Sequence, residues 1–146
     1  MTDFASALPD PVNQAAFYAD VGGKRLLAWV IDSLMIFAIC LLVLPFTAFV
    51  ALLVFPALYL AVGFAYRTLT LASRSATWGM RLMAVEFRDH HGARFGFGTA
   101  LIHTLGYSLS MAFVLPQIIS VVLMVTSARG QGLTDMVVGS AAINRP

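Results

Sequence analysis

Two long apolar stretches dominate the chain. The first covers residues 26–66 and contains a single charged residue, Asp32. As one helix it would extend about 60 Å, twice the ~30 Å hydrocarbon core of a bilayer. The stretch therefore predicts a hairpin of two spans, at residues 25–44 and 48–66, with the turn at Pro45. Pro56 lies inside the second span, and we expect it to kink that helix.

The second apolar stretch covers residues 99–128 and has Pro116 near its middle. It is too long for one upright helix and barely long enough for two full spans. It predicts either a single tilted span or two short helices that enter the membrane and return, bending at Pro116. We favour the returning arrangement, because it leaves every Lys and Arg on one side of the membrane. It also brings residues 136–143, which have the pattern of a strand, to that side.

A basic linker, residues 67–97, separates the two apolar stretches. Short arginine-rich loops stay in the cytoplasm, which also places the N-terminus there. Within the linker, residues 81–87 have the pattern of a strand, residues 89–92 that of a turn, and residues 93–97 return, so we expect a β-hairpin. Residues 1–17 are rich in Asp, Pro and polar residues, and are predicted to form a flexible cytoplasmic tail.

Composition agrees with a membrane protein of one domain, residues 18–143. Apolar residues make up 60% of the chain, charged residues 11%, and the mean hydropathy is +0.85. The predicted fold is an all-α transmembrane bundle of three or four membrane helices. A small cytoplasmic β element, formed by the 81–97 hairpin and the C-terminal strand, completes it.

Composition and spacing also exclude several kinds of function. The net charge of +2 is too small to indicate nucleic acid. The single Cys40 lies in an apolar run, and the chain has no metal-ligand spacing, no catalytic triad and no phosphate loop. We therefore expect no enzyme activity, no metal and no cofactor.

Asp32 is the main candidate for function. A carboxylate at the centre of a lipid-crossing segment costs about 2.5–3.5 kcal/mol on insertion scales, so it faces a partner or a water-filled cavity. Arg25 shares its helix face but lies ~10 Å away along the axis. Partners from other segments are then Arg81, Arg129 and His103. In a structural interpretation Asp32 binds an arginine of the linker and fixes the bundle; in a functional one it is the proton or cation site of an exchanger.

Two further features are candidates. Ala57, Ala61 and Ala65 recur at every fourth position and form a small-residue stripe on which a neighbouring helix could pack, unless this is ordinary alanine usage. Asp135 follows Gly130 and Gly132, in a pattern typical of a turn or cap whose carboxylate accepts backbone N–H bonds.

Several motifs, in order along residues 19–143, resemble the RDD family of bacterial membrane proteins, which is named for one arginine and two aspartates. Residues 19–32 (ADVGGKRLLAWVID) resemble its opening signature, with Arg25 and Asp32 as the arginine and first aspartate. Residues 77–85 (TWGMRLMAV) resemble its T-x-G-K-R-x-x-G-x-x-V segment, and residues 95–100 the S-F-x-x-A that follows. Residues 131–140 (QGLTDMVVGS) resemble its closing R-L-x-D-x-x-A-G-T, with Asp135 as the second aspartate.

The chain departs from the family pattern at four positions, which are Met80, Ala84, Gly132 and Val138. The changes at residues 80 and 132 remove positive charge. For function, the resemblance implies cation/proton exchange, as suggested for some members, or an accessory module.

Three hypotheses follow. The chain is an accessory, assembly or structural subunit that associates with other membrane proteins or forms a homo-oligomer, with Arg25, Asp32 and Asp135 as a polar lock. Alternatively it is a cation/proton antiporter that uses Asp32, or a lipid-interacting module that uses the arginine linker. In each case we expect a multi-pass protein of the bacterial cytoplasmic membrane.

Overall fold

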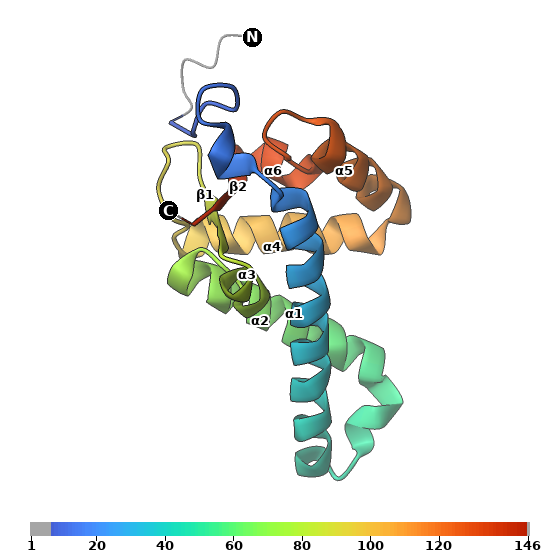
Figure 1. Cartoon of the computed structure of the whole chain (residues 1–146). Helices are drawn as coiled ribbons and strands as arrows, with labels where there is room; N and C mark the ends of the chain where they lie inside the picture. The colour runs from blue at the N-terminus through green and yellow to red at the C-terminus, as the bar shows by residue number, and fades with distance from the viewer. Residues whose placement is uncertain (1–6, 146) are drawn as a thin grey trace.

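In the computed structural model, which describes residues 7–145, a long helical hairpin carries all other elements at one end (Figure 1). Its two arms are α1 (Val21–Val43) and α2 (Phe55–Arg74). With their flanking turns, residues 15–47 and 50–74, both are long and apolar enough to cross a membrane. The structure is mostly helical, as expected, with two or three candidate spans and one small sheet.

The hairpin turns near Pro45 through two short 3-10 helices, η2 (Leu44–Thr47) and η3 (Val50–Val54). The expected kink at Pro56 is wrong. Pro56 lies in the first turn of α2, where the missing N–H would have no intrahelical partner, so the helix begins there instead of bending. At its other end α2 continues to Arg74, through the first part of the predicted linker.

The predicted 81–97 hairpin is also wrong. Arg81 belongs to a short helix, α3 (Trp78–Leu82), and the strand β1 (Val85–Arg88) begins after it. β1 pairs antiparallel with the C-terminal strand β2 (Ala141–Asn144), with Val85 opposite Asn144. Ser75 explains why residues 93–97 do not pair with β1: its backbone carbonyl accepts from Phe87 N, and its hydroxyl donates to Phe87 O and accepts from Phe95 N.

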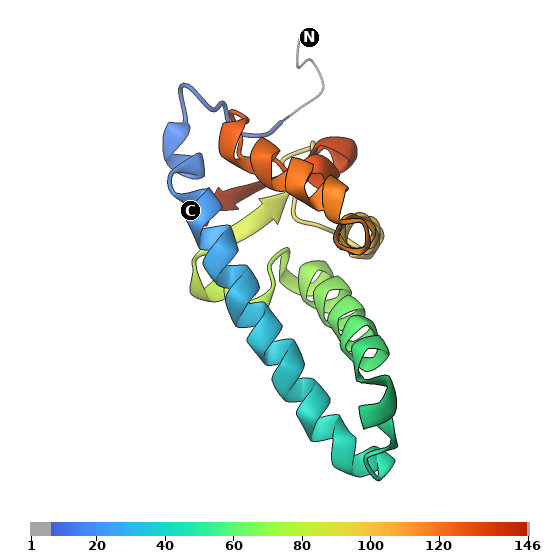
Figure 2. The same ribbon diagram turned by 90° about the vertical axis from the view of Figure 1, so that its right-hand side faces the viewer.

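The second apolar stretch forms α4 (Phe97–Ala112) and α5 (Val114–Thr126), with a bend of 116° between them. The bend precedes Pro116, because a proline ring clashes with the carbonyl four residues earlier, here that of Ala112. Such a bend fits either a broken span or a pair of helices that return, so the returning arrangement and the number of crossings stay predictions. Figure 2 shows α4 end-on, so it runs across the direction of the α1–α2 hairpin.

The C-terminal segment is only partly a strand. Residues 133–138 form α6 (Leu133–Val138), and the expected strand is confined to β2. Gly139 causes the change of direction: its φ of +79° is a left-handed conformation that ends a helix, and its N–H donates to Asp135 O.

The N-terminal segment lies against this sheet. Residues 1–6 of the predicted tail lie outside the described residues. Residues 7–17 pack on the rest of the chain: Ala7 N donates to His90 O, and Asn144 Nδ2 donates to Ala16 O beside the 3-10 helix η1 (Ala15–Tyr18).

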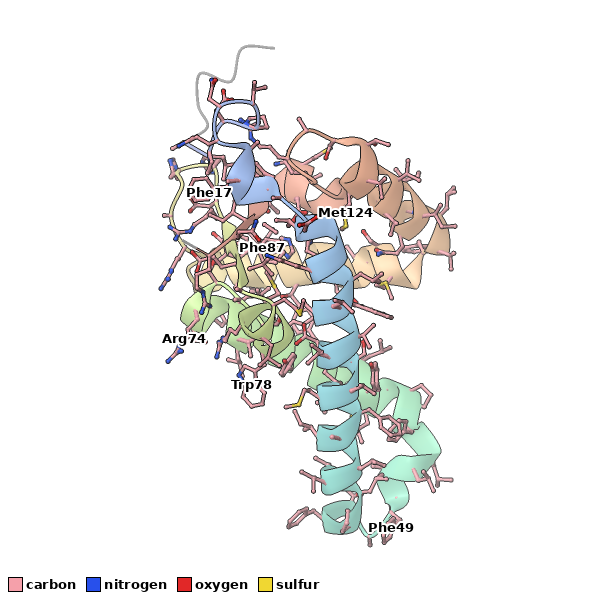
Figure 3. The ribbon with its side chains drawn as sticks, in the orientation of Figure 1. Phe17, Phe49, Arg74, Trp78, Phe87 and Met124 are labelled. Carbon is pink, nitrogen blue, oxygen red and sulfur yellow. The ribbon has the colours of Figure 1, made fainter. Side chains whose placement is uncertain are left out.

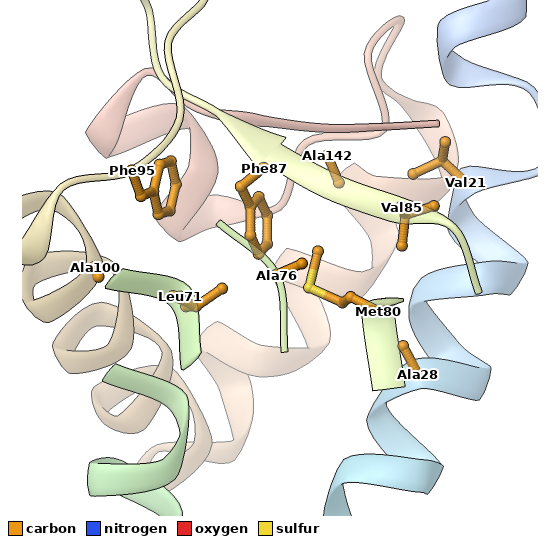
Figure 4. Close-up of a cluster of buried hydrophobic side chains, with 10 residues drawn as sticks. All are labelled: Val21, Ala28, Leu71, Ala76, Met80, Val85, Phe87, Phe95, Ala100 and Ala142. Atoms are coloured by element: carbon orange, nitrogen blue, oxygen red, sulfur yellow. The ribbon is translucent and has the colours of Figure 1, made fainter. Parts of the chain in front are cut away.

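The main core lies between the sheet and the helices α1–α4 (Figure 4). It joins Ala28 of α1 and Leu71 of α2 to Met80 of α3 and to Phe87 of β1. A smaller cluster within the hairpin contains Ile36, Cys40 and Tyr66. By contrast, the stripe of Ala57, Ala61 and Ala65 is exposed and faces away from α1.

Two glycines of α4 give a matched test of the packing of α4 on α6. A β-carbon at Gly106 would lie 2.6 Å from Cγ2 of Thr134, whereas one at Gly98 would have open space. We expect Gly106→Ala to destabilise the protein by about 1–3 kcal/mol through overpacking. Gly98→Ala should be neutral or stabilising, by up to about 1 kcal/mol. Thermal unfolding in detergent measures both, and equal effects would contradict the close approach of the two helices.

Candidate functional site

Asp32 lies at the contact of α1, α2 and α3 and is 1% exposed. From Ala28 to Cys40 the buried residues of α1 recur at every fourth position, and Asp32 is on that inward face. Oδ1 accepts from Tyr66 Oη at 2.6 Å and from Gly79 N at 2.8 Å. Oδ2 accepts from Thr77 Oγ1 at 2.5 Å. Both oxygens of the carboxylate are therefore bonded within the chain.

The short helix α3 delivers two of these three donors. Thr77 precedes the helix and its hydroxyl also accepts from Met80 N, which is an ordinary N-cap. Gly79 permits the contact, because a β-carbon there would lie 2.2 Å from Ala28 O and 2.9 Å from Asp32 Oδ1. The threonine and glycine of the T-x-G segment thus have distinct roles, one as cap and donor and one as the point of closest approach to α1.

The expectation that an arginine neutralises Asp32 is wrong. Among the described residues, the donors to Asp32 are two hydroxyls and one amide. Arg81 instead donates to Thr70 O, in the last turns of α2, and to Ala76 O, just after that helix. Arg129 donates to Pro9 O in the N-terminal segment. Hydroxyls from helices already packed on α1 reach the carboxylate without bringing a second charge into the hairpin.

Asp135 forms a second buried site, and it is here that Arg25 and His103 meet. Arg25 Nη1 lies 2.8 Å from Oδ2, and His103 Nε2 lies 2.7 Å from Oδ1. The predicted cap is present as well, since Gly132 N donates to Oδ2 at 3.0 Å. Ser140 Oγ donates to Oδ1 at 3.2 Å. The carboxylate therefore joins α1, α4, α6 and the segment that leads into β2.

The charge of Asp135 is set by these neighbours. Burial favours the neutral acid, but the positive charge of Arg25, the hydrogen bond and charge of His103 and the amide of Gly132 outweigh it. Together they hold the pKa of Asp135 well below its usual range. Because a carboxylate can only accept, His103 carries a proton on Nε2.

Aromatic rings of the core enclose the same site. His103 lies beside the stacked rings of Phe87 and Phe95, with its ring centroid 4.5 and 5.5 Å from theirs. The guanidinium of Arg25 lies over Phe87, 5.2 Å from its centroid. These rings exclude water from the ion pair and strengthen it.

Arg25, Asp32 and Asp135 thus form two sites along one face of α1, and Ala28 lies between them. Sequence analysis missed three residues of the first site, Tyr66, Thr77 and Gly79. The T-x-G segment was the signal for two of them, because a threonine before a short apolar helix is a typical cap.

Sequence analysis also missed Glu86, a fully buried acid in β1. Its carboxylate pairs with Arg88, with Arg94 at 3.3 Å and with Arg145 at 3.6 Å. The available signal was that Glu86 is one of only two acids in a linker with five arginines. These contacts fix both strands and the loop between β1 and α4.

Chemically, both sites hold carboxylates whose two oxygens each already accept at least one hydrogen bond from the chain. Within residues 7–145 no group of three or more His, Cys, Asp and Glu side chains is arranged to hold a metal ion. The arrangement stabilises packing between elements that are distant in sequence.

Two tyrosines of α2 test the bonds to Asp32. Tyr66 Oη donates to the carboxylate at 2.6 Å, whereas Tyr59 Oη donates to Ser33 O at only 3.4 Å. Tyr66→Phe should destabilise the protein by about 1.5–3 kcal/mol, as expected for a hydrogen bond to a charged group. Tyr59→Phe, the matched control, should cost less than about 0.5 kcal/mol. Denaturant unfolding in detergent measures both; a Tyr66→Phe protein as stable as its control would refute this role.

Acid should weaken the Asp135 site. Since the pKa of Asp135 is lowered in the folded state, its contribution to stability is complete above about pH 5 and is lost progressively as the pH falls below that. Asp135→Asn should cost about 3–5 kcal/mol at neutral pH, because it leaves Arg25 without its charge partner. Its stability should then change less than that of the wild type between about pH 5 and pH 3.

Asp20→Asn is the control for this pH profile, because it makes the same charge change at an exposed carboxylate without a cap bond. Thermal unfolding followed by fluorescence gives the profiles. An Asp135→Asn protein with the acid profile of the wild type would contradict the assignment.

Comparison with known sequences agrees with this geometry. The RDD family model matches residues 18–139, which include Asp32, Asp135, Arg25 and the T-x-G segment. The chain has no significant match among curated proteins or solved structures. Because the match covers most of its length, the chain belongs to the RDD family.

Proposed function

We propose that this RDD protein is a structural or accessory subunit of the membrane, without enzyme activity, that associates with other membrane proteins. The observation that carries the proposal is that each carboxylate oxygen of Asp32 and Asp135 already accepts a hydrogen bond from a group of the same chain. A transport site needs an oxygen that can release its partner and accept an ion. A fixed polar lock needs oxygens that keep their partners, and both Asp32 and Asp135 fit this role better.

The locks give this subunit a defined shape. Asp32 ties α3 to the α1–α2 hairpin, and Asp135 ties α4 and α6 to the start of α1. Breaking the Asp135 lock leaves a buried charge unpaired, and breaking the Asp32 lock leaves buried groups without hydrogen bonds; both are costly in a low dielectric. The hairpin is thereby held to the sheet and to the bent pair α4–α5, and presents a fixed outer surface to other helices.

The exposed stripe of α2 is the surface that we propose for association. Ala57, Ala61 and Ala65 are exposed, while the opposite face of α2 packs on α1 through Leu58, Tyr59 and Val62. Small residues let helix backbones approach closely in lipid, where association depends on packing. Another membrane subunit or a second copy would fit there.

The charge distribution supports an orientation. All nine Lys and Arg residues lie outside residues 26–66, so the end of the hairpin at Pro45 carries none. By the positive-inside rule we place the sheet and N-terminus in the cytoplasm and the Pro45 turn outside, in a bacterial inner membrane.

Purification in a mild detergent followed by native mass spectrometry tests the accessory role. We expect a complex with a defined membrane subunit, lost when Ala57 and Ala61 are both replaced by Leu, because larger side chains separate the helices. Ala38→Leu makes the same change on the exposed face of α1 and should leave the complex intact. A wild-type protein found only as a monomer or homo-oligomer would overturn the accessory role.

Cation/proton exchange is the second candidate, favoured by one observation: Asp32 is a buried carboxylate inside a candidate span and is held by two hydroxyls. Proteoliposomes with a trapped pH-sensitive dye measure it. Sodium-driven proton flux that is lost in Asp32→Asn and retained in Asp20→Asn, with both proteins inserted normally, would favour exchange over the accessory role. Absence of wild-type flux would remove this candidate.

A further inference from the structure

A groove of about 380 Å³ lies between α1 and α3. It is lined by Ile31 and Met35 of α1 and by Trp78, Arg81 and Leu82 of α3. Its volume is within the range of ligand-binding clefts, about 300–1,000 Å³. None of these lining side chains bonds to Asp32 or Asp135, but the ring of Trp78 packs edge-on against Tyr66, whose hydroxyl donates to Asp32, so the groove adjoins the Asp32 site.

The lining is apolar except at Arg81. Trp78 is 45% exposed and Leu82 is 73% exposed, which is unusual for side chains of a short helix that lies beside a core. Ile31 and Met35 belong to a helix long and apolar enough to cross the membrane. The floor of the groove therefore lies at membrane depth, where hydrocarbon chains are the available occupants.

Arg81 lines this groove, and the positive charges of Arg74 and Arg145 act on it; these three arginines are the positive cluster. Arg81 donates through Nε and Nη2 to groups at the end of α2. Nη1 of Arg81 makes no hydrogen bond to the described residues, so its N–H groups can donate to a further acceptor. Burial is the main cause that lowers the pKa of Arg81, and the positive charges of Arg74 and then Arg145 lower it further. Such crowding of like charge favours a bound anion.

The cluster lies on the same side of the molecule as the apolar groove. Figure 3 shows Arg74 and Trp78 on one side of the chain, at the level where α2 ends and α3 begins. Arg74 is exposed and makes the last turn of α2. Arg145 pairs with Glu86, but Arg88 and Arg94 pair with the same carboxylate. One negative charge therefore faces three arginines, and the cluster keeps a net positive charge.

From this juxtaposition we infer that the groove binds one anionic phospholipid, with an acyl chain against Ile31, Met35, Trp78 and Leu82 and the phosphate at Arg81 and Arg74. The interface between headgroup and acyl chain would then lie at Trp78, a position that this residue type favours. The lipid would seal the outer side of the α1–α3 contact. This inference does not depend on the accessory role.

Fluorescence of Trp78 tests the inference. Trp29 and Trp78 are the two tryptophans of the chain, so a Trp29→Phe background reports on Trp78 alone. The protein is placed in phosphatidylcholine vesicles that contain increasing amounts of phosphatidylglycerol with brominated acyl chains, which quench indole. Brominated phosphatidylcholine in place of the anionic lipid measures quenching by bulk lipid. We expect quenching at much lower mole fractions of the anionic lipid.

Arginine variants identify the headgroup site. Arg74→Gln and Arg81→Gln should each weaken the preference for the anionic lipid about fivefold, the value of one basic residue near an anionic surface. Arg94→Gln removes an exposed arginine from the loop after β1 and should leave the preference unchanged. Because Arg81 also bonds backbone groups, Arg74→Gln decides the result if Arg81→Gln does not fold.

Competition separates lipid from free phosphate. Unbrominated phosphatidylglycerol should reverse the excess quenching, and inorganic phosphate should not. Equal quenching by both brominated lipids would overturn the inference. So would an unchanged preference in Arg74→Gln, or reversal by inorganic phosphate alone.

Discussion

A carboxylate buried in a membrane helix must find its partners within the chain, and this requirement organises the whole molecule. Asp32 takes three donors, from Tyr66, Thr77 and Gly79, and so determines where α3 lies on the hairpin. Hydroxyls and an amide satisfy the charge without importing an arginine into lipid. The cost of leaving any of these bonds unmade, about 1–3 kcal/mol for a buried group, is what makes the arrangement specific.

Asp135 applies the same constraint outside the hairpin. Its partners Arg25 and His103 come from α1 and α4, and Gly132 caps the helix that carries it. Arg25 and Asp32 lie on one face of α1, so both sites use the same helix. The Asp32 site holds α2 and α3 to α1, and the Asp135 site holds α4 and α6 to it. The aromatic rings of Phe87 and Phe95 keep water from the second site. The result is a small membrane module whose polar groups serve its own packing.

The sequence was sufficient for the features that depend on local pattern. Apolar length predicts the hairpin, Pro45 its turn, and motif spacing the family. Prediction from the sequence failed where the partners come from distant segments. Ser75 bonds to the backbone of residues 87 and 95, and β1 pairs with β2 instead of with residues 93–97. Asp32 binds hydroxyls because α3 packs on α1 at Ala28. Ala84, one of the departures from the family pattern, has a φ of +56°, which explains why glycine is common there.

Hydrogen exchange at the amide of Gly79 tests the central claim most directly, because this N–H donates to Asp32 across the α1–α3 contact. In the wild-type protein the amide should exchange as slowly as those in the middle of α2. In Asp32→Ala its protection should fall far more than that of amides in α5, which does not contact Asp32. Rapid exchange of Gly79 in the wild type, or protection that is unchanged in Asp32→Ala, would contradict the account.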